Sequence, residues 1–442
     1  MEFYNTEYAM DKKYAKEIAK KVNAFSFSTK TKIHIGIFIL SVVLSVSCST
    51  FKRKETKAIY SPEKGTFGYD VEFLRSKDDI IILKNNSGKA QIIVSPKYQG
   101  KVFTSTAQGL EGKSFGWINY VLISKDTLLE HMNGYGSENR LWIGPEGGQF
   151  SVFFKPGGEM NFDNWFTPAS FDTEPWELIS GDDKAVFMGK NMVLENYSGT
   201  KFKLKINRNI FLLGKTRIED LLQVILIDGV DWVGYKSENT MTNTGENEWT
   251  RESGAFSIWM LDMFLSGENI TVVIPFNKGE KKRLGPIATT NYFGEISPER
   301  IKFDDSVIYF KVDGKKRKKL GLAPGRAKPV SGSYDEDNQV LTVVHYSIPP
   351  GIFEYVNQLW PYQEYPFTGD VMNSYNDGPL ENGTQMGPFY EIESSSPAAF
   401  LAPGGSITHE HSVFHFMGEE EKLNKISEAV FGVTISDIKA AF

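Results

Sequence analysis

The stretch FYEIESSSPAAFLAPGGSITHEHSVFHF, residues 389–416, contains two runs that are typical of β-strands. The first run, FYEIES, alternates apolar and acidic side chains, which is the period-two pattern of a strand. The second run, SVFHFMG (412–418), is rich in the aromatic and β-branched residues that strands favour. Pro403, Gly404 and Gly405 lie between them and indicate a turn. The stretch therefore predicts two strands separated by a polar turn.

The same pattern extends back to residue 67. Short alternating or β-branched runs are separated by turn signals such as NGY, NTGE, DGK and NDG, because Gly and Asn tolerate positive φ. The other expected strands are DIIILK (79–84), AQIIVS (90–95), GKVFTST (100–106), NYVLIS (119–124), RLWIG (140–144), QFSVFF (149–154), KAVFMG (184–189), NMVLEN (191–196), KFKLKI (201–206), FSIWML (256–261), NITVVIPF (269–276), SVIYFKV (306–312), QVLTVVHYSI (339–348) and AAFLA (398–402).

The runs do not alternate with helical segments, which argues against a parallel α/β sheet. We therefore expect an all-β, antiparallel sandwich or barrel. One helix is expected at EEEKLNKISEAVFG (419–432), where apolar residues recur at helical spacing, and a second short helix could form near residue 435. No composition break or repeat divides the chain, so residues 67–442 are predicted to form a single domain.

Composition excludes several classes of protein. Of the 442 residues, 40% are hydrophobic, 24% are charged and 13% are aromatic, which suits a packed globular protein and excludes a disordered or polytopic membrane chain. The formal net charge of −6 gives no support for a nucleic-acid partner.

The N-terminal region resembles a bacterial lipoprotein leader. Residues 33–47 contain no charged side chain and follow Lys30 and Lys32, which is typical of a secretory signal peptide. Cys48, the only cysteine, follows directly, as in a lipobox. We predict a signal peptide over 1–47, lipidation of Cys48, a tether over 48–66, and an envelope location at the periplasmic or outer-membrane face. An uncleaved anchor is the alternative, and because the leader is long the true start could lie downstream.

Two C-terminal blocks carry a resemblance to a known group of proteins. QVLTVVHYSIPPGIFEYVNQLW (339–360) and the stretch 389–416 resemble, in order and spacing, core strands of the galactose mutarotase-like superfamily, which includes the aldose 1-epimerases. Residues 133–154 and 240–249 are similar to related stretches of that group. More closely, the chain resembles Bacteroidetes-type lipoproteins of this superfamily. The resemblance implies an antiparallel β-supersandwich that binds a mono- or oligosaccharide on its concave face.

Glu391 and Glu393 are the candidate catalytic residues. They are two positions apart, so on a strand they point to the same face. There, one carboxylate could take a proton from a sugar hydroxyl while the other accepts hydrogen bonds. The resemblance assigns the general base best to Glu393, with Glu391 next. The two could also be ordinary solvated carboxylates on an exposed strand.

The residue that would act as the acid in such a reaction does not match the superfamily pattern. Where the superfamily has a histidine after Thr-Asn, this chain has Thr244 after Asn243. We therefore predict an envelope lipoprotein that binds carbohydrate without certain catalysis. The alternative is a sugar-active enzyme, an epimerase, lyase or hydrolase, that uses Glu393 and Glu391 as acid and base.

Other side chains are candidates for carbohydrate contacts. Arg140 and Trp142 share a strand face, where guanidinium can bind hydroxyls and indole can stack on a pyranose. Trp can equally be part of the core. The full set of expected carbohydrate contacts is Arg140, Trp142, Glu146, Asn243, Trp249, Tyr375, Asn376 and Asp377.

The stretch 366–383 is rich in Asp and Asn side chains, whose oxygen atoms can bind a sugar or a cation. Its Asp and Asn side chains could bind sugar hydroxyls, cap their own turns, or ligate Ca²⁺. His409, His411 and His415 alternate on one face of the last strand and could in principle bind a metal. We expect no cofactor and no metal, with Ca²⁺ as the alternative.

Two basic runs, GEKKR (279–283) and DGKKRKKLG (313–321), are flanked by glycine. Both are predicted to be solvated hairpin tips. Attraction to an anionic polysaccharide or to lipopolysaccharide is a second interpretation.

Overall fold

The computed structural model describes residues 62–442. The predictions for the signal peptide, for Cys48 and for most of the tether lie outside the described residues. Within residues 62–442, no helix is long and apolar enough to cross a membrane.

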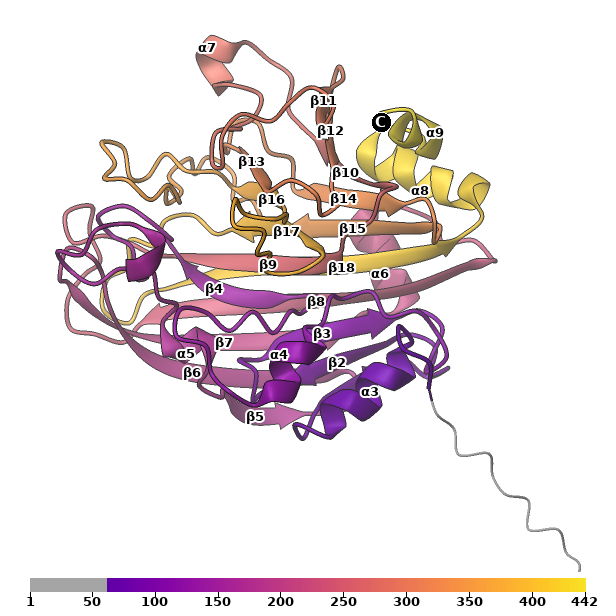
Figure 1. The fold of residues 1–442 in the computed structure, drawn as a ribbon, viewed down its shortest axis with the longest axis horizontal. Helices are drawn as coiled ribbons and strands as arrows, with labels where there is room; N and C mark the ends of the chain where they lie inside the picture. Colours follow the sequence, from indigo (N-terminus) through magenta and orange to yellow (C-terminus); the bar gives the residue numbers. More distant parts are fainter. Residues whose placement is uncertain (1–61) are drawn as a thin grey trace, which may run out of the picture. The chain divides into compact units, whose positions relative to one another are not determined.

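The largest element is a ten-stranded antiparallel sheet with the strand order β11-β12-β10-β14-β15-β18-β8-β7-β6-β5 (Figure 1). The longest pairing of neighbouring strands in this sheet is between β8 and β18, and it extends over the whole length of β18. The strands are β5 (Glu177–Gly181), β6 (Ala185–Glu195), β7 (Lys201–Leu212), β8 (Val230–Asn243), β10 (Ile270–Pro275), β11 (Ile301–Phe303), β12 (Val307–Lys311), β14 (Val330–Asp335), β15 (Val340–Tyr346) and β18 (Ser406–Gly418).

Two smaller antiparallel sheets complete the β-structure. A five-stranded sheet has the order β13-β16-β17-β9-β4, and a three-stranded sheet has the order β1-β2-β3. Their strands are β1 (Ile81–Lys84), β2 (Gln91–Ser95), β3 (Lys101–Thr106), β4 (Arg140–Gly144), β9 (Ser257–Leu265), β13 (Lys318–Leu322), β16 (Met372–Asn376) and β17 (Phe389–Ser395). The prediction of an all-β, antiparallel fold is confirmed.

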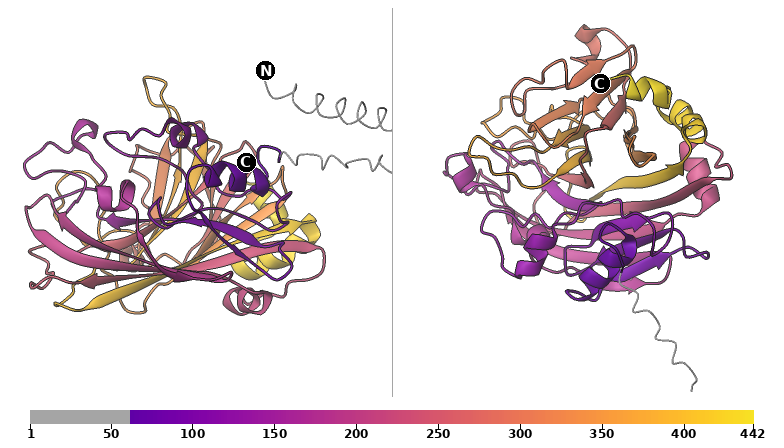
Figure 2. Two further views of the ribbon diagram at one scale, coloured as in Figure 1. Left: turned by 90° about the horizontal axis from the view of Figure 1, so that it is seen from below. Right: turned by 45° about the vertical axis from the view of Figure 1, so that its right-hand side comes forward.

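The helices are short. They are α3 (Phe67–Arg75), α4 (Tyr120–Lys125), α5 (Ala169–Asp172), the 3₁₀ turn η1 (Phe162–Asn164), α6 (Lys215–Leu222), α7 (Lys281–Leu284), α8 (Glu420–Phe431) and α9 (Ile435–Lys439). The predicted C-terminal helix is confirmed as α8, which ends at Phe431 and is capped by Gly432 with a positive φ of 77°. The second short helix is α9. Figure 2 shows both, in yellow, beside the strands of the large sheet.

Each face of the large sheet is covered by different elements. Alternate residues of β15 and β18, such as Leu341 and Phe414, pack with α6, α8 and α9. Residues of the opposite parity, such as Val344 and Val413, pack against the two smaller sheets, together with Ile392 of β17. The period of two along each strand therefore divides the apolar residues between two cores.

Several local predictions were wrong. The run 119–124 forms α4 instead of a strand, because the Asn119 side chain accepts a hydrogen bond from the Leu122 amide and caps the helix. The runs 149–154 and 398–402 are irregular, and each has one isolated β-bridge. Helix α3 was not expected, although Thr66 caps it and Phe67, Val71 and Leu74 form its buried stripe.

The three histidines of β18 form a polar layer between the sheets. His411 contacts Asp262 at 2.6 Å and Ser394 at 2.7 Å, and His409 contacts the same Ser394 hydroxyl at 2.7 Å. His415 lies 2.9 Å from Glu138. Ser394, His411 and Asp262 form a hydrogen-bonded chain of the kind found in a catalytic triad, and all three side chains are buried. Inside the sandwich these buried side chains hydrogen-bond to one another.

We expect Asp262→Ala to lower the free energy of unfolding by about 3 to 5 kcal/mol, because it leaves His411 and Asn139 buried without their partner. Urea denaturation measures the loss. The matched control is Asp337→Ala, which removes an exposed carboxylate and should change stability by less than about 0.5 kcal/mol. Equal effects of the two substitutions would contradict a structural role for this layer.

Candidate functional site

The five-stranded sheet turns one face toward the large sheet and the other away from it. In β17, Ile392 and Ser394 point inward, so Glu391 and Glu393 lie on the other face. The register places Asn373 and Leu261 beside Glu393. The same register aligns further residues on this face from four neighbouring strands, namely Arg140, Trp142, Trp259, Met263, Lys319 and Tyr375. We call Arg140, Trp259, Lys319, Glu391 and Glu393 the carboxylate cluster.

Glu393 lies at the centre of this cluster. Its Oε2 accepts hydrogen bonds from the Trp259 indole at 2.9 Å and from the Lys319 ammonium at 2.8 Å. The side chain is 0% exposed, and its other oxygen, Oε1, has no partner among the described residues. A buried polar atom without a partner costs about 1–3 kcal/mol. Glu393 therefore offers a desolvated acceptor that a hydroxyl could satisfy.

Glu391 is paired with a second cation. Its Oε1 accepts a hydrogen bond from Arg140 Nη2 at 2.8 Å, and the guanidinium lies over the Trp142 ring at 4.3 Å. Burial raises the pKa of the Glu391 carboxyl, and the nearby Glu393 raises it further, while Arg140 opposes both effects. A carboxyl with a raised pKa can act as an acid near neutral pH.

Lys319 connects the cluster to the segment that precedes β11. Its ammonium lies 4.9 Å from the Trp259 ring and 5.6 Å from the Tyr292 ring. The Tyr292 hydroxyl donates to Asp370 at 2.6 Å. Burial raises the pKa of Asp370 to about 6, although hydrogen bonds from Tyr292 and Thr289 oppose the shift. The segment that carries Tyr292 is thus bound to the edge of the sheet beside Glu393.

Glu146 is a third carboxyl near the cluster. Burial raises its pKa, Lys319 lowers it, and the charge of Glu393 raises it again, so the three groups interact electrostatically. The Glu146 amide donates to the Gln358 side chain at 2.6 Å, which holds the turn after β4 in place.

Tyr375 shares the sheet face with the glutamates. Its hydroxyl donates to Asp377 at 2.6 Å and accepts from Arg317 at 3.0 Å. Asp377 also accepts from the Gly387 amide at 3.0 Å. Asn376 has the opposite parity, and its amide group bonds the backbone of Gly314 and Lys316. Asn376 therefore supports the turn that connects β12 to β13 and does not point to the cluster.

Besides Asn376, two more of the predicted contact residues, Trp249 and Asn243, lie away from the cluster. Trp249 packs in the core against Phe202 and Phe256. Asn243 ends β8 in the large sheet, where its amide donates to the carbonyls of Asn247 and Leu401. Trp142 does lie on the cluster's face, but it is only 4% exposed and packs against Phe153 as well as Arg140.

Sequence reasoning missed Lys319. The run 313–321 was predicted to be a solvated tip, but its last residues form β13, and Lys319 is buried. The available signal was the apolar alternation of KKLGL, which follows the exposed lysines directly. The positive charge that balances Glu393 was therefore in a run that we assigned to solvent.

Within residues 62–442 no group of three His, Cys, Asp or Glu side chains is placed to hold a metal ion. In the stretch 366–383, Asp370 and Asp377 each bond a tyrosine hydroxyl, at opposite ends of β16.

We expect Asp370→Asn to remove part of the pH dependence of stability. The folded pKa of Asp370, about 6, is above its ordinary value of 3.8, so between about pH 4 and 6 the folded state retains a proton that the unfolded state has lost. Over this window the wild-type free energy of unfolding should fall with rising pH by up to about 3 kcal/mol more than that of the variant. Denaturant titrations at several pH values measure the difference, and parallel curves would contradict it. Asp337→Asn, at an exposed site, serves as the control.

Solved structures with a similar fold include a galactose mutarotase-like protein from Lactobacillus casei, which is 12% identical with a TM-score of 0.42. That match covers 76% of this chain and 99% of the other. A galactose mutarotase related enzyme from Lactobacillus acidophilus is 10% identical, with a TM-score of 0.42 and coverage of 76% and 97%. A protein from Synechocystis sp. PCC 6803 is 14% identical, with a TM-score of 0.45 and coverage of 82% and 100%. The sequence resemblance described above was to this same group, the galactose mutarotase-like proteins.

No curated protein matches the chain. The model of a protein family, however, matches residues 65–442, which includes nearly all of the described residues. The chain therefore belongs to DUF6786, a family of unknown function.

Proposed function

We propose that this protein binds a mono- or oligosaccharide at the carboxylate cluster. The observation that carries the proposal is Glu393 Oε1, a buried carboxylate oxygen without a partner among the described residues, on the same sheet face as two cations and an indole. Sugar hydroxyls are both donors and acceptors, so they can pair with carboxylates and with guanidinium or ammonium groups at once.

Access to Glu393 is the main requirement of this proposal. The side chains of the cluster are almost fully buried, and the Tyr292 and Phe293 rings lie next to Lys319 and Arg317. Tyr292 is itself only partly exposed. A saccharide would therefore displace Tyr292 from Lys319 and take its place beside Glu393.

We expect Glu393→Gln to weaken saccharide binding by about tenfold or more, because an amide accepts a hydroxyl hydrogen bond less strongly than a carboxylate and no longer pairs with Lys319. Isothermal titration calorimetry against a panel of neutral and acidic mono- and oligosaccharides identifies the ligand and measures the change. Glu248→Gln, in the loop that follows β8, is the matched control and should bind as the wild type does. The absence of heat with every sugar, or equal affinities of wild type and Glu393→Gln, would contradict the proposal.

A second candidate function is chemistry on the bound sugar, as an epimerase, lyase or hydrolase. The observation that favours it is the set of neighbouring carboxyls with different environments: burial raises the pKa of Glu391 and of Glu146, while Glu393 is held by Lys319. One group can then donate a proton while another accepts one, which supplies the acid that the missing histidine would provide. If so, Glu393→Gln abolishes turnover of the sugar that calorimetry identifies. A protein that only binds has no turnover to lose.

We also propose that the protein is an envelope lipoprotein anchored through Cys48. The support is the uncharged run 33–47 followed directly by the only cysteine of the chain.

Mass spectrometry of protein from membranes should show a mature chain that begins at a lipidated Cys48. Cys48→Ser should shift the protein from the membrane fraction to the soluble one, since the lipid supplies most of the membrane affinity. An unmodified Cys48 within an intact leader would contradict the proposal.

A further inference from the structure

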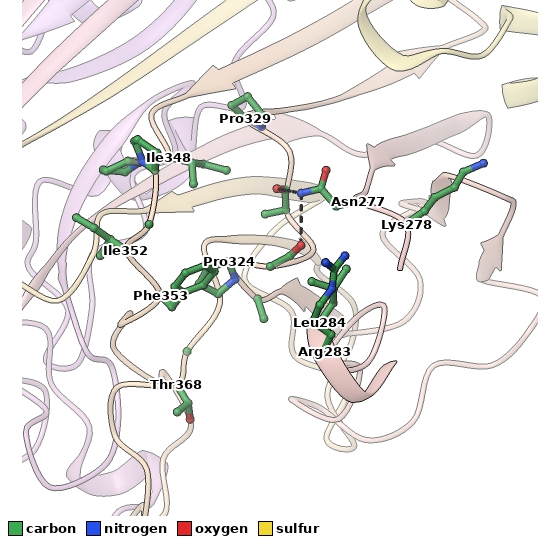
Figure 3. Close-up of a pocket in the computed structure, with 17 residues that line it drawn as sticks. Asn277, Lys278, Arg283, Leu284, Pro324, Pro329, Ile348, Ile352, Phe353 and Thr368 are labelled. Carbon is green, nitrogen blue, oxygen red and sulfur yellow. Dashed lines mark hydrogen bonds between the residues drawn. The ribbon is translucent and has the colours of Figure 1, made fainter. Parts of the chain in front are cut away.

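A large pocket lies away from the carboxylate cluster, where β10 and β15 of the large sheet end near β13 and β16 of the five-stranded sheet (Figure 3). Its volume is about 910 Å³, within the range of small-molecule sites. None of the residues of the carboxylate cluster lines it.

Most of the pocket wall is apolar. Figure 3 shows Ile352 and Phe353 on one side and Leu284 on the other. Pro324, Pro329 and Ile348 also line the pocket. Phe353 is 65% exposed and its neighbour Ile352 is 43% exposed, so this part of the apolar wall is open to solvent. Few side chains of this wall can bond hydroxyl groups, so the wall suits an apolar body better than a sugar ring.

The charged residues that line the pocket are all basic. They are Lys278 and Arg283, and no Asp or Glu is among the lining residues. Lys278 pairs with Asp305, outside the pocket. The Arg283 guanidinium makes no hydrogen bond or ion pair with the residues that the structure describes, and its side chain is exposed. Figure 3 shows it next to Leu284 at the edge of the apolar wall. Arg283 is therefore a cation available to a ligand.

A third cation lies behind the wall. Arg326 is buried, and its guanidinium donates to the backbone carbonyls of Asn277, Gly279, Gly285 and Pro286 at 2.9–3.3 Å. No carboxylate among the described residues pairs with it. These bonds connect the two ends of the loop that carries α7, so the position of Arg283 is preorganised. The buried charge also makes the potential of the pocket more positive.

We propose that this pocket binds an amphiphilic anion, a ligand with an acyl chain or similar apolar body and one carboxylate or phosphate group. The apolar body contacts Phe353, Ile352 and the prolines, and the anionic group pairs with Arg283. A free fatty acid and a lipid phosphate share this chemistry. The site is separate from the carboxylate cluster and does not depend on its function.

The test uses the chain from residue 49 onward and four probes below their micelle concentrations: dodecanoate, dodecyl phosphate, dodecanol and an oligomer of galacturonic acid. Calorimetry should show one molecule of dodecanoate or dodecyl phosphate bound per chain. Tighter binding of dodecanoate would indicate a free fatty acid as the ligand, and tighter binding of dodecyl phosphate would indicate a lipid phosphate. Dodecanol, which lacks the charge, should bind about fivefold more weakly, as expected for a partly solvated ion pair.

Two variants assign the binding to this pocket. Arg283→Gln should weaken dodecanoate about fivefold and leave dodecanol unchanged, whereas Phe353→Ser should weaken both about tenfold because it removes apolar contact area. The matched controls are Arg217→Gln and Phe162→Ser, at exposed positions outside the pocket, and both should bind as the wild type does. The proposal is overturned if neither anionic amphiphile binds, if the controls lose as much affinity as the pocket variants, or if only the galacturonic acid oligomer binds through Arg283.

Discussion

The alternation of side chains along β17 is the constraint on which the candidate site depends. Ile392 and Ser394 must face the interior, where they meet the apolar core and the histidines of β18. Glu391 and Glu393 are then forced to the opposite face by the period of two. A shift of register by one residue would bury both carboxylates in the apolar core, so the interior contacts and the position of the site are a single structural feature.

Both faces of this strand contain charge that burial would make costly. On the inner side, Asp262 contacts His411, and Glu138 contacts His415 through Oε1, while Glu138 Oε2 has no partner among the described residues. On the outer side, Arg140 and Lys319 balance Glu391 and Glu393, but one oxygen of Glu393 is left without a partner. Each side thus retains one buried carboxylate oxygen without a partner among the described residues. The outer cluster differs in having two cations and an indole beside its carboxylates, which suits it better to a polar ligand.

The two proposed binding regions differ in their polarity and in the sign of their charged side chains. The carboxylate cluster is rich in polar atoms with fixed partners, which suits a ligand with many hydroxyls. The pocket beside α7 has an apolar wall and cations without a lining carboxylate, which suits an anion with an apolar body. Arg326 organises the second region from behind the wall, because its guanidinium donates to four backbone carbonyls.

The sequence by itself determined the all-β class, the antiparallel arrangement, the C-terminal helix and the shared face of Glu391 and Glu393, because each depends on a short-range period. Local capping overrode that period at residues 119–124, where the Asn119 side chain starts a helix in a β-branched run. Only the tertiary structure decided which residues join the glutamates. Lys319 lies 74 residues from Glu393 in the chain, and although the alternation of KKLGL indicates a strand there, it does not show that this strand lies beside Glu393. Trp249 and Asn243 were placed in the core and at a strand end by long-range packing. Spacing along a strand thus specifies a face, but the partners across that face come from strand pairing, which single residues do not encode.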